Sequence, residues 1–316
     1  MKQITFQANI DESITFLTDL LPKKVDYKSL DWLNEKTAMI RKNPLERNIF
    51  LNFSLASRFF SKDIVEMNKE EIAKAQNIRK GFQPHGWNAL QIARTIILLN
   101  IPYENPEKHL SILNALFEAA DVAELTALYA ALPLLSNPEM LTKRAAEGIR
   151  TNMTVVLDAI VLNNPYPSEF LDEVSWNQLV LKTIFTERPV HQIYGGDDRA
   201  NKKLALTLSD YAHERWAAGR AVTPELWRYT GKFTNNTLLK DLERLLKNGN
   251  AFEQAAAKLV CKDSENERAM KLLADCESDI TTTYNNWDAL GKAYLASKGE
   301  LPSGYQQAGS GVSASN

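Results

Sequence analysis

The chain has 316 residues, of which 44% are hydrophobic and 24% are charged, with 37 basic and 39 acidic side chains. This balance is typical of a globular protein, and the near-neutral charge excludes a globally basic nucleic-acid binder. The low content of glycine (13) and proline (12) argues against collagen-like and turn-dense β structure. Two cysteines and four histidines are too few for a disulfide framework or a histidine-rich metal centre.

The N-terminal segment does not resemble a targeting signal, because Asp11, Glu12 and Asp19 interrupt its apolar residues. The longest apolar stretch, Leu90 to Leu99, contains Gln91 and Arg94. It is about half the ~20 residues that a membrane-spanning helix requires. We therefore expect a cytoplasmic protein with reduced thiols that does not span a membrane.

Hydrophobic residues recur at steps of three and four along most of the chain, as in an amphipathic α-helix. Examples of such steps are Leu110, Leu113, Leu116, Phe117 and Ala120, then Leu204, Leu208, Tyr211, Ala212 and Trp216, and then Leu238, Leu242, Leu245 and Leu246. Alternation of the kind found in strands is nowhere sustained, and β-branched residues are scattered. The sequence predicts an all-α fold.

Proline and glycine separate these helical segments at short intervals. Asn105-Pro106, Asn137-Pro138 and Thr223-Pro224 each combine an N-cap residue with proline at the first helical position. The spacing predicts roughly a dozen helices of about 8–20 residues joined by short turns. Short helices of this kind pack as antiparallel pairs, which favours a HEAT- or armadillo-like α-solenoid. We expect one helical domain over residues 1–298 and a flexible tail over 299–316, where Ser, Gly and Gln dominate.

Motifs that carry common chemistries are missing from the sequence. Gly195-Gly196 precedes Asp197 and Asp198, whose carboxylates would repel a phosphate. Neither a Walker motif nor G-x-S-x-G nor H-E-x-x-H occurs. Cys261 and Cys276 are interpreted as ordinary helix residues. The sequence therefore predicts no cofactor and no metal site.

Polar residues with potential roles concentrate between residues 150 and 228. Arg150 and Asn152 flank an apolar helical segment, where they either point donors into a pocket or cap a helix. In the next segment, residues 176–185, Asn177 and Lys182 lie beside an apolar stripe and could reach a ligand. A polar residue at a helix start and a snorkelling lysine explain them equally well. A further helix is predicted to start near Asn201, just after Arg199.

On that helix Asp210 and His213 are three residues apart and share a face, followed by Trp216. We expect Asp210 to hold the imidazole in a network between helices, and a catalytic pair is the alternative. Earlier in the chain, Asn88 is predicted to cap a helix that carries Arg94. An arginine on an otherwise apolar helix is costly to bury without a partner, so Arg94 is interpreted as half of a structural ion pair. An inward-facing functional arginine is the alternative. The tryptophans are interpreted mainly as core anchors.

Three stretches resemble the EboA family: WNQLVLK at 176–182, RAN at 199–201 and DYAHERWAAGR at 210–220. The resemblance covers about residues 30–250. It implies a component of a bacterial secondary-metabolite gene cluster whose neighbours include a prenyltransferase-like and a metal-hydrolase-like enzyme, and it transfers no chemistry to this chain. The family pattern has a single acidic residue before Arg199, so a separate role for Asp197 is not expected.

We expect a non-catalytic helical adaptor or small-molecule-binding protein that serves this pathway, because solenoids expose extended concave surfaces. Its partners would be other proteins of the pathway or a small metabolite, and not nucleic acid. The candidate surface comprises Arg150, Asn152, Asn177, Arg199, Asp210, His213 and Trp216. The alternative is an all-α enzyme that acts on an isoprenoid-linked or cyclitol-like intermediate. Nucleic-acid binding is a third hypothesis, which the even spread of Lys and Arg disfavours.

Overall fold

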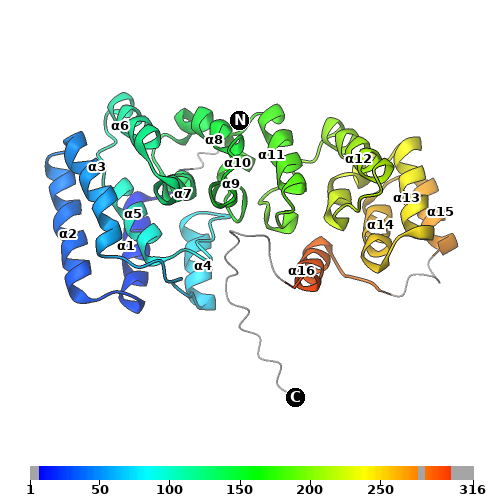
Figure 1. Ribbon diagram of the computed structural model, residues 1–316, viewed down its shortest axis with the longest axis horizontal. Coiled ribbons are helices and arrows are strands. Elements are labelled where there is room, and N and C mark those ends of the chain that lie inside the picture. The colour runs from blue at the N-terminus through cyan, green and yellow to red at the C-terminus, as the bar shows by residue number, and fades with distance from the viewer. Residues whose placement is uncertain (1–6, 277–281, 300–316) are drawn as a thin grey trace, which may run out of the picture. The chain divides into compact units, whose positions relative to one another are not determined.

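The structure is a computed structural model, and it describes residues 7–276 and 282–299. All regular elements within these residues are helices (Figure 1). An isolated antiparallel bridge joins Ile64 to Asn88. The all-α prediction is therefore confirmed. Beyond Gly299, the predicted flexible tail lies outside the described residues.

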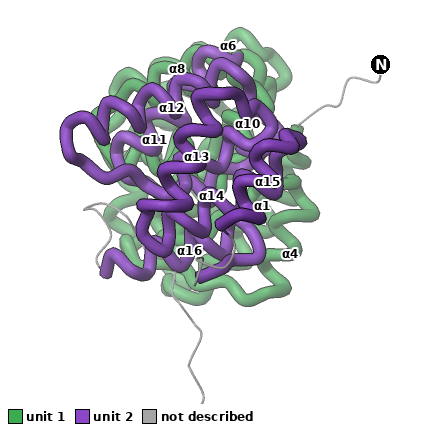
Figure 2. Tube along the Cα trace, turned by 90° about the vertical axis from the view of Figure 1, so that its right-hand side faces the viewer, with its two compact units in different colours: residues 1–172, 304–316 green, residues 173–303 purple. Residues whose placement is uncertain are grey.

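The described chain divides into two compact units (Figure 2). Unit 1 holds residues 7–172, and unit 2 holds residues 173–276 and 282–299. The expectation of a single domain over residues 1–298 stays a prediction.

Unit 1 consists of ten α-helices and four short 3₁₀ helices within the described residues. The α-helices are α1 (Ile10–Leu20), α2 (Tyr27–Lys42), α3 (Glu46–Leu55), α4 (Lys69–Ile78), α5 (Ala89–Leu99), α6 (Pro106–Ala119), α7 (Val122–Ala131), α8 (Thr142–Ile149), α9 (Thr154–Val161) and α10 (Tyr166–Phe170). The 3₁₀ helices are η1 (Leu21–Lys23), η2 (Ala56–Arg58), η3 (Leu132–Leu134) and η4 (Pro138–Leu141).

Helix α5 forms the centre of unit 1, because almost all of its residues are buried. The Asn88 side chain caps it by accepting a hydrogen bond from the Gln91 N–H at 2.8 Å, as predicted. Helices α1, α2, α3 and α7 all pack against α5. Helix α7 in turn packs against α9, so α5, α7 and α9 form a row of alternate helices.

The buried Arg94 on α5 has the ion-pair partner that the sequence requires. Its Nη2 lies 3.3 Å from Oε1 of Glu124 on α7, and its Nε donates to the Phe53 carbonyl at 3.1 Å. Glu124 also accepts a hydrogen bond from the Ser54 hydroxyl. A guanidinium that is 2% exposed would be costly to bury without these contacts, so the pair joins α5 to α7 as a structural element.

The three predicted caps before proline have different outcomes. Asn105 caps α6 by accepting from the Lys108 N–H at 3.0 Å. Asn137 instead adopts the left-handed backbone conformation (φ 50°) and makes no capping hydrogen bond. Thr223 likewise does not cap, and the segment after it is a 3₁₀ helix. These two cap predictions are wrong, because proline at the first position starts a 3₁₀ turn as readily as an α-helix.

Unit 2 contains longer α-helices and three 3₁₀ helices within the described residues. The α-helices are α11 (Glu173–Phe185), α12 (Lys202–Ala217), α13 (Asn236–Asn248), α14 (Ala251–Asp263), α15 (Glu267–Cys276) and α16 (Trp287–Ser297). The 3₁₀ helices are η5 (Val190–Gln192), η6 (Pro224–Tyr229) and η7 (Gly231–Phe233).

Helix α14 forms the centre of unit 2, where it packs against α13, α15, α16 and η6. Its buried residues include Ala255, Ala256 and Ala257, and small side chains let neighbouring helices approach closely. The short η6 inserts Leu226, Trp227 and Tyr229 into the same core. Since aromatic side chains supply large buried areas, η6 stabilises unit 2 far more than its length suggests.

Candidate functional site

The seven residues of the predicted surface divide between the two units. Arg150 and Asn152 belong to unit 1, where both are exposed around the turn that joins α8 to α9. The other five belong to unit 2. A binding role for Arg150 and Asn152 stays a prediction.

Asn177 and Arg199 both make contacts that stabilise the start of α12. The buried Asn177 side chain exchanges two hydrogen bonds with the amide of Asn201, at 2.8 and 3.2 Å. Asn201 is the N-cap of α12 and accepts from the Leu204 N–H at 2.9 Å, so the helix starts where the sequence predicted. The guanidinium carbon of Arg199 lies 5.0 Å from the centre of the Trp176 ring. The arrangement fixes the position at which α12 begins.

His213 is held by a buried carboxylate, but that carboxylate does not come from Asp210. His213 Nε2 lies 2.6 Å from Oδ1 of Asp241 on α13, and the Ser209 hydroxyl donates to Oδ2 of the same carboxylate at 2.6 Å. Asp210 is exposed on α12. The predicted network between helices at His213 is therefore present, but the carboxylate that holds the imidazole belongs to Asp241 and not to Asp210.

Trp216, one turn after His213, lies in a stack of flat side chains. Its ring centre is 5.6 Å from that of the fully buried Trp227, with 25° between the ring planes. The guanidinium carbon of Arg244, on α13, lies 4.2 Å from the Trp216 ring centre. Cation–π contact at this distance restricts the long Arg244 side chain. Trp216 therefore connects the core of unit 2 to a cationic group at its surface.

A surface pocket of about 310 Å³ opens beside this stack. Its walls come from the end of α12, the turn that follows, α13 and the first turn of α14. The lining residues are Trp216, Gly219, Arg220, Ala221, Arg244, Leu245, Asn248, Gly249 and Glu253, and we call this the Trp216 pocket. A volume near 300 Å³ corresponds to the lower end of small-molecule sites.

The turn that carries Arg220 into the pocket wall is fixed by Arg215. Both Nε and Nη2 of Arg215 donate to the Ala221 carbonyl, at 3.2 and 3.0 Å. Gly219 takes the left-handed backbone conformation with φ of 68°, which favours glycine. The backbone of residues 219–221, which forms this part of the pocket wall, is therefore held in one conformation.

The pocket contains two guanidinium groups without an ion-pair partner. In the described part of the chain, neither Arg220 nor Arg244 has a carboxylate within ion-pair distance. The one carboxylate in the lining, that of Glu253, accepts a hydrogen bond from the Asn250 N–H at 2.9 Å in the capping box of α14. The lining thus carries two positive charges and one negative charge that is engaged elsewhere.

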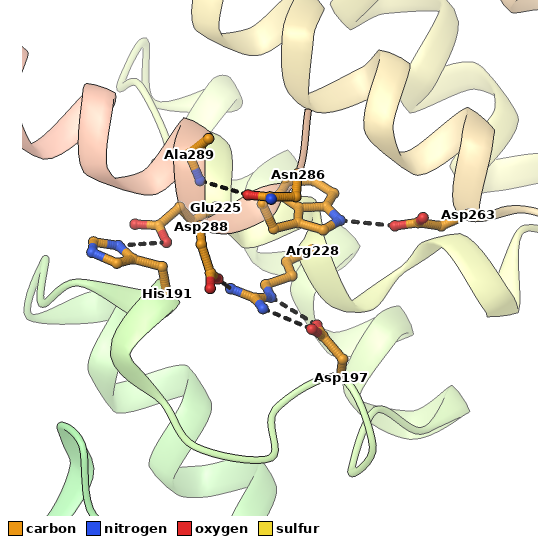
Figure 3. A network of polar contacts seen from close by, with 9 residues as sticks. His191, Asp197, Glu225, Arg228, Asp263, Asn286, Asp288 and Ala289 are labelled. Atoms are coloured by element: carbon orange, nitrogen blue, oxygen red, sulfur yellow. Dashed lines mark hydrogen bonds and ion pairs between the residues drawn. The ribbon is translucent and has the colours of Figure 1, made fainter. Parts of the chain in front are cut away.

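A polar network surrounds η6 (Figure 3), the 3₁₀ helix that also carries Trp227. Arg228 donates to both oxygens of Asp197, at 2.6 and 2.7 Å, and to Asp288 on α16 at 2.8 Å. Burial alone would lower the pKa of Arg228, but the hydrogen bond to Asp197 and the two nearby carboxylates raise it above its ordinary value. The paired carboxylates therefore compensate the burial of this guanidinium.

The buried His191 on η5 extends this network on the other side of η6. Its Nδ1 lies 3.1 Å from Oε1 of Glu225, and both side chains are 3% exposed. Helix α16 covers the pair with Gly291, where an added Cβ would lie 2.5 Å from each of these two atoms. Gly196 contacts Tyr229 in the same manner, with 2.4 Å from the built Cβ to the hydroxyl oxygen. These glycines let the surrounding backbone approach η6 closely.

The network also separates the two acidic residues that follow Gly196. Asp197 makes the contact with Arg228, whereas Asp198 is exposed. The expectation that Asp197 has no role distinct from Asp198 is therefore wrong. The sequence offered no signal for this difference, because Arg228 lies 31 residues further along.

A larger pocket of about 520 Å³ lies in unit 1. Its lining includes Arg41, whose Nε already bonds the Asn100 side chain, and Thr37, whose hydroxyl donates to the Leu33 carbonyl. Arg41 and Lys42 of this pocket also lack an ion-pair partner among the described residues, but its lining contains no aromatic side chain. The Trp216 pocket, where Arg244 stacks on Trp216, is therefore the stronger candidate despite its smaller volume.

Comparison with known proteins identifies the family. Residues 13–231 match the family model described as "Metabolite traffic protein EboA". The chain belongs to the EboA family. The match ends before α13, so in this EboA-family chain Trp216 and Arg220 lie within the matched region and Arg244 lies outside it.

The other comparisons identify no relative. Neither the curated proteins nor the solved structures contain a match to the chain. Two features are absent from the described residues of this EboA-family chain. No helix among them is both long and apolar enough to cross a bilayer, and no three potential metal-ligating side chains gather together.

Proposed function

We propose that this protein is a non-catalytic helical adaptor that holds a small metabolite in the Trp216 pocket of unit 2. The family description, a metabolite traffic protein, supports a role connected with metabolites. The observation that carries the proposal is the pair of unpartnered guanidinium groups beside Trp216 in a pocket of about 310 Å³. Charged groups that the fold leaves without partners are available to a ligand.

The state of the reactive side chains supports binding over catalysis. Burial, together with the nearby Cys276, raises the pKa of the Cys261 thiol to about 12. A buried thiol of this kind is a poor nucleophile. In unit 2 the Ser209 hydroxyl donates to Asp241 and not to an imidazole, so it lacks the base that would activate it.

An all-α enzyme is the second candidate, and the His213–Asp241 contact favours it. A carboxylate on one ring nitrogen orients an imidazole so that the other nitrogen can act as a base. The His213 ring centre lies 5.8 Å from that of Trp216, which lines the pocket. A reaction on the bound metabolite would then proceed beside the pocket.

The outer surface of such an adaptor would serve protein partners of the same pathway. We propose that the helices continue as a HEAT- or armadillo-like solenoid that folds as one domain in the cytoplasm. The row formed by α5, α7 and α9 supports this arrangement within unit 1, because solenoids stack alternate helices in the same way.

Native mass spectrometry of the full chain purified from its own cells tests the proposed function. The proposal predicts a retained small molecule that is lost in Trp216→Ala and kept in Trp32→Ala, a matched change in unit 1. Its mass should not change during incubation. A product that accumulates in the wild-type protein and not in His213→Ala would favour the enzyme. Retention that Trp216→Ala does not affect would contradict the proposed site.

A further inference from the structure

The chemistry of the Trp216 pocket defines a class of ligand. We propose that it takes a small organic oxyanion, a carboxylate or phosphate group on an apolar or aromatic body. This inference rests on the proposed function, because it names the ligand class of the same pocket.

Arg220 and Arg244 indicate that the ligand carries an anionic group. Guanidinium groups present a planar fork of donors that matches carboxylate and phosphate oxygens. Both arginines line the pocket, and neither has an ion-pair partner in the described part of the chain. Glu253 is the opposing charge in the lining, and its carboxylate already accepts the Asn250 N–H. With two guanidinium groups and one carboxylate, the lining of the pocket therefore carries a net positive charge.

Arg244 is better prepared for this role than an ordinary surface arginine. Its guanidinium carbon lies 4.2 Å from the Trp216 ring centre, and Trp216 in turn stacks on the fully buried Trp227. The stack limits the conformations that the side chain can adopt, so less entropy is lost when an anion binds. Arg220 is restricted in a different way, through the turn that Arg215 holds against the Ala221 carbonyl.

The remaining lining residues indicate that the ligand also has an organic part. Trp216 and Leu245 contribute apolar surface, and Asn248 contributes an amide that both donates and accepts. A pocket of about 310 Å³ is larger than a bare inorganic anion needs. The ligand therefore has an organic part that contacts Trp216 and an oxyanion that contacts the arginines.

The lining of the pocket comes from two parts of the sequence. Trp216 and Arg220 lie in the region that matches the family, whereas Arg244 and Asn248 belong to α13, beyond residue 231. The pocket therefore combines residues from within and beyond the matched region.

Calorimetric titration of the full chain with four probes tests the inference. The probes are phenyl phosphate, benzoate, benzyl alcohol and inorganic phosphate. Phenyl phosphate and benzoate should bind, with affinity that falls as salt rises, and whichever binds more tightly identifies the preferred oxyanion. Benzyl alcohol and inorganic phosphate should each bind at least tenfold more weakly, because one lacks the anion and the other lacks the organic body.

Variants assign the binding to the pocket. Arg220→Gln and Arg244→Gln should each weaken the better anionic probe at least tenfold, and Arg244→Lys should recover part of the loss. Arg47→Gln removes an exposed arginine of unit 1 and should leave the affinity unchanged. All three positions are exposed, and thermal melting of each variant confirms that it is folded.

The outcomes separate the inference from the proposed function. Equal affinity for benzyl alcohol and phenyl phosphate, or equal effects of Arg47→Gln and Arg244→Gln, would overturn the oxyanion class. A neutral molecule retained from cells would also overturn it and would leave the proposed function intact. If inorganic phosphate binds as tightly as phenyl phosphate, the inference that the ligand has an organic part would be contradicted. Anion binding at Arg244 by a protein that retains nothing from its cells would support the ligand class and contradict the proposed function.

Discussion

Asp241 on α13 holds the imidazole of His213 on α12, with 2.6 Å between Oδ1 and Nε2. The carboxylate is buried and also accepts the hydroxyl of Ser209, which is itself buried. These contacts join α12 to α13 directly behind the wall of the Trp216 pocket. They make Asp241 a structural residue whose removal leaves two polar groups without their acceptor.

Replacement of Asp241 should therefore be costly. Asp241→Ala is expected to lower the free energy of unfolding by about 2–3 kcal/mol, because the buried Ser209 hydroxyl and the imidazole lose their acceptor. The matched control is Asp210→Ala, an exposed change on α12 that should stay within about 0.5 kcal/mol of wild type. Urea denaturation followed by tryptophan fluorescence measures both. Equal effects of the two substitutions would contradict the assignment of Asp241 as the partner of His213.

The neighbouring acids Asp197 and Asp198 offer a second matched pair. Asp197→Ala removes two charge-assisted hydrogen bonds from Arg228 and leaves it only Asp288. Since the Asp197 side chain is 52% exposed, solvent reduces the expected loss to about 1–2 kcal/mol. Asp198→Ala should have little effect. A larger loss of stability in Asp198→Ala than in Asp197→Ala would show that the loop is held differently.

Gly291 tests how closely α16 approaches the His191–Glu225 pair. Glycine to alanine inside a helix ordinarily stabilises it by about 1 kcal/mol. Here the added Cβ would lie 2.5 Å from His191 Nδ1 and from Glu225 Oε1, and both side chains are buried and paired. Gly291→Ala should thus lower the melting temperature, whereas Lys292→Ala, an exposed change in the same helix, should not. A melting temperature that rises in Gly291→Ala would contradict the packing.

His109 makes the stability of unit 1 depend on pH. Burial lowers its pKa to about 4 from the ordinary 6.5, although Glu104 acts in the opposite direction. The unfolded chain therefore binds a proton more readily than the folded chain. The stabilisation from a neutral His109 is complete above pH 6.5 and is lost as the pH falls toward 4.

His109→Asn removes this dependence. The decrease in the free energy of unfolding between pH 7.5 and pH 4.5 should be smaller in the variant than in the wild type by about 2–3 kcal/mol. Urea denaturation at several pH values measures the difference, and the contribution of the carboxylates cancels because both proteins share them. A difference between the two proteins that stays constant across this range would contradict a neutral, buried His109.

Local features of the fold were predictable from the sequence. The caps Asn88, Asn105 and Asn201 act on backbone groups three residues away, so a short window contains the whole interaction. The buried partner of Arg94 was predictable in kind, because an arginine in an apolar helix requires one. Its identity as Glu124 depends on how α5 packs against α7.

The features that define the candidate site were not predictable in the same way. Asp241 lies 28 residues from His213, and Asp210 is an equally reasonable partner from spacing alone. Arg244 sits among charged residues of α13, including the exposed Glu243–Lys247 pair, and resembles any solvated helix face. Only the packing of α13 against α12 brings its guanidinium over Trp216. The sequence indicated Trp216 but not the two arginines that make its surroundings a pocket for an anion.

The most direct test of the account observes the indole N–H groups by heteronuclear NMR. The protein is compared as purified from its own cells and after exhaustive removal of small molecules, with Trp216 assigned through Trp216→Phe. The account predicts that the Trp216 resonance shifts on removal of the ligand while those of Trp32 and Trp87, in unit 1, stay unchanged. A shift confined to Trp32 or Trp87, with Trp216 unaffected, would contradict the claim that the pocket beside Arg244 holds the metabolite.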